Sequence, residues 1–172
     1  LSDYPPPARD FVGFRAMAEN TRKHLRPVIF TPAGVQAILE MADALLEGKS
    51  LRDYPIFSLG FTSVSPLRWS DSALEVFRVS SGYGIPLMVN SEVISGATGP
   101  VTLAGTLALA NAEALSGVTI AQLLEPGRPV VFNLGFSHIF DMRVVETLTG
   151  SPEGGLIGAA GNALARLHGL PS

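Results

Sequence analysis

The first group of residues suited to chemistry is the glycine-rich segment SGATGPVT at residues 95–102, which runs directly into an Ala/Leu-rich segment. In one interpretation, Thr98 or Thr102 caps a helix and the glycines form the preceding turn. In another, backbone N–H groups at the helix start, uncovered by side chains, bind an anionic or planar ligand. The spacing matches neither the G-x-G-x-x-G fingerprint nor a Walker A loop. A phosphate site would also need a nearby cation, and Arg78 is the only Lys or Arg between residues 70 and 125.

Two clusters of polar side chains lie at the ends of apolar runs. One is Asn90-Ser91-Glu92, and the other extends from Asn133 through Ser137 and His138 to Asp141. His138 is the only histidine in such a position, since the other two lie at predicted helix ends. His138 and Asp141 supply two metal ligands with no third nearby, so we predict no metal site.

The elements that carry these residues repeat one pattern, in which an apolar run is followed by a helical segment. Strands are predicted at residues 26–30, 54–61, 85–93 and 129–136. Helices are predicted at residues 10–23, 33–48, 70–82 and 151–169, and a further helix is predicted directly after the glycine-rich segment. Two of these helices have cap-plus-proline starts, at Thr31-Pro32 and Ser151-Pro152. Such repeats indicate an α/β fold with a parallel sheet, either doubly wound or part of a (β/α)8 barrel.

Composition excludes several classes of protein. A net charge of −3 with no clustered basic surface predicts no nucleic-acid partner. The absence of cysteine and of a secretory signal favours a cytoplasmic location. Residues 101–124 are strongly apolar, but Asn111, Glu113 and Gln122 interrupt them, so we predict a buried helix and no membrane partner. A charged fraction of 16% is low and suggests a surface partly covered by other protein.

Three segments resemble the trimethylamine methyltransferase family, the corrinoid-dependent amine methyltransferases that include glycine betaine methyltransferases. They are residues 96–132, the loop SVSPLRW at residues 63–69, and residues 141–172. The resemblance follows the family's order through most of the chain. It implies parallel βα repeats forming about half of a TIM-type (β/α)8 barrel over residues 1–172. The chain then looks like an internal fragment, without the family's N-terminal part and last barrel strands.

The chemistry that the resemblance implies is transfer of a methyl group from a methylated amine to the cobalt of a corrinoid held by a separate carrier protein. No cofactor is expected to bind tightly to this chain, and no catalytic residue is assigned, because such an enzyme mainly orients its reactants. Aromatic faces bind methylammonium groups. The expected substrate-binding residues are Phe61, Trp69, Phe136, Glu92, Asn133 and His138, with Phe30 a weaker candidate. For each phenylalanine core packing is the simpler explanation, whereas Trp69 is the better candidate because it lies in a loop.

The resemblance also gives the glycine-rich segment a role, since loops after strands form the active face of a barrel. A flat corrinoid needs a surface without bulky side chains. The expected corrinoid-facing residues are Gly96, Thr98, Gly99, Pro100 and Thr102. The expected partners are the carrier protein, a small methylated amine and further copies of the chain, because open barrel edges recruit partners. Two alternatives stay open: a phosphate-binding barrel enzyme, and an inactive fragment with a structural role.

Overall fold

The computed structural model describes residues 3–5, 8–135 and 137–172. Its residues form two compact units, each discussed by itself. The first comprises Leu1–Gly60, Asp71–Leu87 and Ala121–Pro129; the second comprises Phe61–Ser70, Met88–Ile120 and Val130–Ser172. The prediction of one partial-barrel domain over residues 1–172 stays a prediction.

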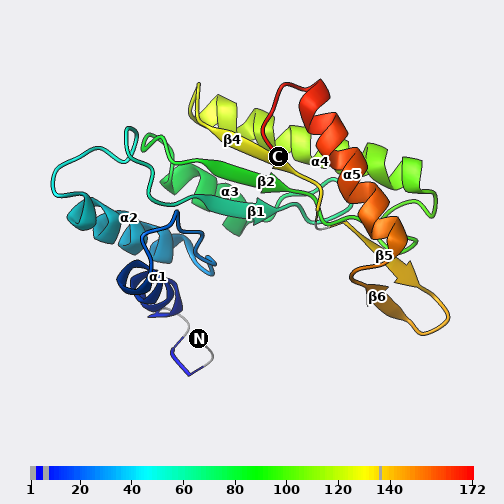
Figure 1. Ribbon diagram of the computed structural model, residues 1–172, viewed down its shortest axis with the longest axis horizontal. Helices are drawn as coiled ribbons and strands as arrows, with labels where there is room; N and C mark the ends of the chain where they lie inside the picture. Colours follow the sequence, from blue (N-terminus) through cyan, green and yellow to red (C-terminus); the bar gives the residue numbers. More distant parts are fainter. Residues whose placement is uncertain (1–2, 6–7, 136) are drawn as a thin grey trace. The chain divides into compact units, whose positions relative to one another are not determined.

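The described elements are labelled in Figure 1. The helices are α1 (Arg9–Asn20), α2 (Pro32–Leu46), α3 (Asp71–Val79), α4 (Leu103–Leu124) and α5 (Pro152–Leu167). The strands are β1 (Leu59–Thr62), β2 (Leu87–Asn90), β3 (Ile94–Ser95), β4 (Val130–Asn133), β5 (His138–Asp141) and β6 (Glu146–Leu148). The predicted mixed α/β class is confirmed.

The main sheet has the strand order β1-β2-β4, so its strands follow one another as they do along the chain. Four backbone hydrogen bonds advance in the same direction along both partners: Leu59 N to Pro86 O, Ser63 N to Asn90 O, Leu87 N to Pro129 O, and Ser91 N to Asn133 O. The strands are therefore parallel, as the apolar runs predict.

The strand predicted at residues 26–30 is wrong. In the described part of the chain, the neighbouring Leu25 forms an isolated parallel bridge with Phe57, and residues 26–30 are not in a strand. Pro27 has no N–H to continue a ladder. The N–H of Phe30 donates instead to the buried carboxylate of Asp10, at 2.8 Å. A polar partner in α1 thus replaces the strand neighbour that the apolar run predicts.

A second, smaller sheet is absent from the sequence prediction, which places residues 137–141 in a loop. Its strand order is β3-β5-β6, with β3 and β5 parallel and β5 and β6 antiparallel. Figure 1 shows β5 and β6 as a hairpin that precedes α5. The turn lies at residues 142–145, where Val145 has a φ of 58°.

Both predicted cap-plus-proline helix starts are confirmed. The Thr31 hydroxyl accepts a hydrogen bond from Gly34 N at 2.9 Å, with Pro32 opening α2. The Ser151 hydroxyl accepts from Gly154 N at 3.1 Å, with Pro152 opening α5. Each side chain satisfies one of the N–H groups that a helix start leaves unpaired.

Helix α4 is 22 residues long and contains an 18-residue stretch with a mean hydropathy of 1.4, so by length and composition alone it could cross a membrane. A core helix of a soluble protein meets the same criterion. The predicted buried helix is correct for one face only, whose buried residues are Thr106, Ala110, Glu113, Ala114, Gly117 and Ala121. In the second unit Ala110 and Ala114 share a core with Phe132 of β4.

Candidate functional site

The candidate site lies in the second unit, where β1, β2 and β4 end and their following loops begin. Asn90 closes β2 and is 2% exposed. Asn133 closes β4, and its Nδ2 donates to Asn90 Oδ1 at 2.8 Å. The Asn133 Oδ1 accepts from Gly135 N at 2.9 Å. Two amide side chains are therefore fixed against each other at the carboxyl end of the sheet, which is where ligands bind in parallel α/β proteins.

The loop after β1 folds into a tight turn. Val64 N donates to Arg68 O at 2.7 Å and Arg68 N donates to Val64 O at 3.1 Å. Leu67 has a φ of 53°, in the left-handed region that is unfavourable for a residue with a Cβ. Its side chain is 66% exposed. The turn therefore presents the apolar side chain of Leu67 to solvent. The unfavourable backbone conformation of Leu67 has to be stabilised by contacts with other residues.

Glu113 of α4 holds this turn in place, a role that the sequence pattern does not predict. Its Oε2 accepts from the hydroxyls of Ser63 at 2.5 Å, Ser65 at 2.8 Å and Ser91 at 2.8 Å. Its Oε1 accepts from Leu67 N at 2.8 Å, and the side chain is 1% exposed. The available signal is a lone acid inside an apolar helix, which was interpreted above only as evidence against a membrane span.

Trp69 ends the same loop and lies against α4. Its Nε1 donates to the Ser116 hydroxyl at 2.9 Å. A Cβ added at Gly117 would lie 2.5 Å from Trp69 Cζ2, so the indole packs directly on the helix backbone. Trp69, the aromatic residue predicted to lie in a loop, is half-buried there, and its indole N–H is hydrogen-bonded to α4.

The other predicted substrate-binding residues are spread over different surroundings. Phe61 is half-buried in β1. It lies two residues before the buried Ser63, so the two side chains point to the same face of the strand. Glu92 is exposed between buried neighbours. His138 is half-buried in β5, where its N–H donates to Val93 O at 3.1 Å. Phe136 lies outside the described residues. Asn133, from the predicted set, is hydrogen-bonded to a second polar side chain, that of Asn90, at the sheet end.

Asp141, considered as a metal ligand beside His138, is occupied by another partner. Two hydrogen bonds from the Arg143 guanidinium, at 3.0 and 2.6 Å, and one from Arg143 N lower its pKa from 3.8 to about 2. Within residues 3–5, 8–135 and 137–172, no cluster of three or more potential ligands is suitable for a metal.

The glycine-rich loop is held by its own hydrogen bonds. The N–H groups of Ala97, Thr98 and Gly99 all donate to Ile94 O at 3.0 Å, and Gly96 N donates to the carbonyls of Gly99 and Pro100. These N–H groups already have acceptors within the loop, which argues against the phosphate-binding alternative. Gly96 has a φ of 84°, which favours glycine, whereas a Cβ at Gly99 would lie 2.3 Å from Val93 Cγ1.

The threonines of this loop also act locally. Thr98 Oγ1 accepts from Ile94 N at 2.9 Å. Thr102 Oγ1 accepts from Gly105 N at 3.3 Å, which caps the start of α4. The interpretation as a turn with a helix cap is therefore confirmed. Ala97 and Pro100 are exposed, so small side chains form the outer surface of the loop.

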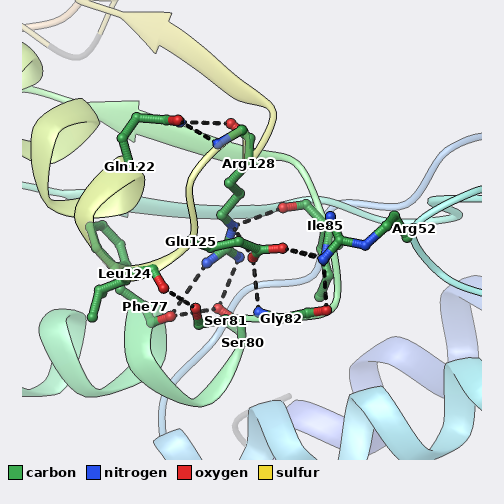
Figure 2. Close-up of polar contacts among 12 residues, drawn as sticks. Arg52, Phe77, Ser80, Ser81, Gly82, Ile85, Gln122, Leu124, Glu125 and Arg128 are labelled. Carbon is green, nitrogen blue, oxygen red and sulfur yellow. Dashed lines mark hydrogen bonds and ion pairs between the residues drawn. The ribbon is translucent and has the colours of Figure 1, made fainter.

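The first unit contains a network of charged side chains (Figure 2). Its residues come shortly before the strands in the sequence, whereas the candidate site is made of residues that follow the strands. Arg128 precedes β4, and its side chain is fully buried. It donates to Ile85 O at 3.0 Å and to Ser80 Oγ at 2.9 Å, and lies 3.8 Å from Glu125. Burial lowers the pKa of Arg128, and the Glu125 charge partly opposes that effect. Glu125 also accepts from Arg52 at 2.7 Å.

The parallel strands, and polar groups gathered where they end, define an α/β protein of the kind that places its site on the loops after the strands. The family model for trimethylamine methyltransferase (MTTB) matches residues 2–172. The chain therefore belongs to the trimethylamine methyltransferase family, and the resemblance seen in the sequence is confirmed.

Named relatives support the same assignment. A trimethylamine methyltransferase of Methanosarcina barkeri is 38% identical over 98% of this chain and 36% of its own length. A trimethylamine methyltransferase of Desulfitobacterium hafniense is 37% identical over 89% of the chain and 31% of its own. A glycine betaine methyltransferase of the same species is 37% identical over 78% and 28%. The chain thus spans about a third of the length of these relatives.

Proposed function

We propose that the protein transfers a methyl group from a methylated amine, either trimethylamine or a quaternary amine such as glycine betaine, to the cobalt of a corrinoid on a carrier protein. The observation that carries this proposal is the family match along residues 2–172. Relatives of similar identity are named for trimethylamine and for glycine betaine, so the amine itself stays open between them.

We also propose that the main sheet is about half of a (β/α)8 barrel. Its parallel strands stand in chain order, and the isolated bridge between Leu25 and Phe57 has the same parallel direction. A barrel built from such repeats places its active groups on the loops after the strands. That edge carries Asn90 and Asn133 and the loop that ends at Trp69.

The corrinoid would supply the nucleophile, so the protein has to orient the amine and exclude water. Asn90 and Asn133 are the polar groups that we assign to the amine, because their amides are fixed at the end of the sheet. A quaternary amine leaves as a neutral amine, and trimethylamine in its protonated form leaves as neutral dimethylamine, so neither takes a proton from the chain and no general acid is required. Phe61 and Trp69 remain candidates for contact with its methyl groups.

The glycine-rich loop is our candidate surface for the carrier's corrinoid. Among the described residues, the one atom within 4 Å of a Cβ at Gly96 would be Phe140 O, at 3.9 Å, so the described residues leave that point uncrowded. The neighbouring Ala97 and Pro100 are exposed and short. A flat macrocycle can approach such a surface closely. We assign the protein to the cytoplasm and expect it to form homo-oligomers, with exposed apolar side chains such as Val101, at 78% exposure, in support.

The test uses the protein at its natural length with a corrinoid carrier protein and a panel of methylated amines. Methylation of cobalt is followed by absorbance and the demethylated amine by NMR. Asn133→Ala should lower the rate on the order of tenfold, since it removes a fixed hydrogen-bonding group. Asn20→Ala, at the exposed end of α1, is the matched control and should have no effect. Failure of every methylated amine to methylate the carrier would refute the proposed function.

A further inference from the structure

Glu113 is a buried acid inside an apolar helix. It is the one charged residue between positions 103 and 124 and is 1% exposed. No ion pair to it is found within the described part of the chain; its four hydrogen-bond partners are three serine hydroxyls and a backbone N–H. Burial of a charge is costly unless donors satisfy it. A buried acid with four hydrogen-bond donors around it therefore does more than fill space in the core.

The four donors come from two separate loops. Ser63, Ser65 and Leu67 follow β1, whereas Ser91 follows β2. One carboxylate therefore fastens both loops at the carboxyl end of the sheet. Ser91 is adjacent to Asn90, whose side chain accepts from Asn133.

The same helix holds the far end of the first loop. Ser116 lies three residues beyond Glu113, and its hydroxyl donates to the Glu113 carbonyl at 2.6 Å while accepting from Trp69 Nε1 at 2.9 Å. Between the two anchors lies Leu67, whose left-handed φ of 53° is held by its N–H bond to Glu113. Both anchors are contributed by one rigid helix, so the loop has a single defined position.

We infer that Glu113 is a positioning residue: its carboxylate sets the loop of residues 63–69, and with it the Trp69 indole and the Leu67 side chain, relative to Ser91 at the end of β2. The effect on catalysis rests on the proposed function, whereas the effect on the loop does not. The ligand-independent part can therefore be tested by spectroscopy and the dependent part by methyl transfer.

The spectroscopic test uses Trp69, the only tryptophan among the 172 residues. Any tryptophan outside them is replaced by phenylalanine. Glu113→Ala should shift the Trp69 emission to the red and increase its quenching by acrylamide. Glu113→Gln should give a smaller shift, because its amide oxygen still accepts from Leu67 N and serine hydroxyls can accept from its NH2. Glu125→Gln removes the charge from another buried acid that accepts from three donors and should leave Trp69 unchanged.

Two further variants keep the inference testable if Glu113→Ala fails to fold. Ser65→Ala removes one donor from within the loop and should give a small red shift by itself. Leu67→Gly tolerates the positive φ without support, so it should restore part of the Trp69 emission when combined with Glu113→Gln. Unchanged emission in folded Glu113→Ala or Ser65→Ala, or equal shifts in the Glu113 and Glu125 variants, would overturn the inference.

Methyl transfer supplies the second measurement. Displacement of the loop by about 1 Å should lower the rate by roughly 10²-fold in Glu113→Ala, with partial recovery in Glu113→Gln and no change in Glu125→Gln. A wild-type protein that transfers no methyl group, with Trp69 still responding to Glu113, would refute the proposed function and leave the positioning role supported. An active protein whose rate and emission both ignore Glu113→Ala would refute the positioning role alone.

Discussion

Gly117→Ala should destabilise the protein, although the same change stabilises an ordinary helix. Alanine is favoured over glycine in a helix interior by about 1 kcal/mol. At Gly117, however, the new Cβ would lie 2.5 Å from Trp69 Cζ2 and 2.5 Å from Val89 Cγ1. Normal carbon contacts are about 3.5–4 Å. Val89 is branched and lies in β2, so it has little freedom to move. The indole of Trp69 must therefore move by about 1 Å to relieve the contact.

The expected cost follows from these contacts. Overpacking costs about 1–3 kcal/mol, and loss of the 2.9 Å hydrogen bond from Trp69 to Ser116 costs about 1 kcal/mol more. Set against the gain in helix propensity of about 1 kcal/mol, the net loss is about 2 kcal/mol. That loss lowers the melting temperature by roughly 4–8 °C for a chain of this size.

The assay is denaturant unfolding followed by circular dichroism, together with Trp69 emission in the folded state. Gly158→Ala is the matched control, because a Cβ there meets no atom of the described residues within 4 Å and the residue lies inside α5. The control should stabilise by about 1 kcal/mol. Equal stabilisation by both variants, with Trp69 emission unchanged, would refute the contact between the indole and α4.

Two further predictions concern charged groups. Arg128→Met should destabilise by about 1–3 kcal/mol in denaturant unfolding, because it leaves Ile85 O without its buried donor, while Glu125 keeps its bonds from Arg52, Gly82 and Gly84; an unchanged stability would contradict this. For Asp141, the folded pKa of about 2 lies below the ordinary 3.8, so its pairing with Arg143 stabilises above about pH 4 and is lost as the pH falls through about 2. Arg143→Met should raise the Asp141 pKa from about 2 towards 3.8 in NMR titration of the β5–β6 hairpin, and an unchanged titration would refute the pairing.

Local signals predicted the helices well. Thr31-Pro32 and Ser151-Pro152 each supply a side-chain acceptor and a residue that needs no N–H partner, so the start of the helix is determined within four residues. Parallel strand order was also predictable, because each apolar run is followed by a helix that must cross over the sheet. In these cases the deciding interactions lie close together in the sequence.

The errors arose where a distant partner decides the conformation. Residues 26–30 have the composition of a strand, but Asp10 binds the N–H groups of Phe30 and Thr31 from α1. The β5–β6 hairpin turns at residues 142–145, which contain no Gly, Pro, Asn or Asp, so the usual turn signals are missing. Glu113 was missed as a site residue because its donors lie 22 to 50 residues away.

The two candidate loops differ in what specifies them. The glycine-rich loop closes on itself, since Ile94 O accepts from three consecutive N–H groups and Gly99 packs on Val93. The loop of residues 63–69 instead takes its position from Glu113 and Gly117 of α4. A substitution in α4 should therefore move the second loop and leave the first unchanged. The apolar helix α4 thus positions part of the candidate site through the carboxylate of Glu113 and through Gly117, whose lack of a side chain leaves room for the indole. Neither residue needs to touch a substrate.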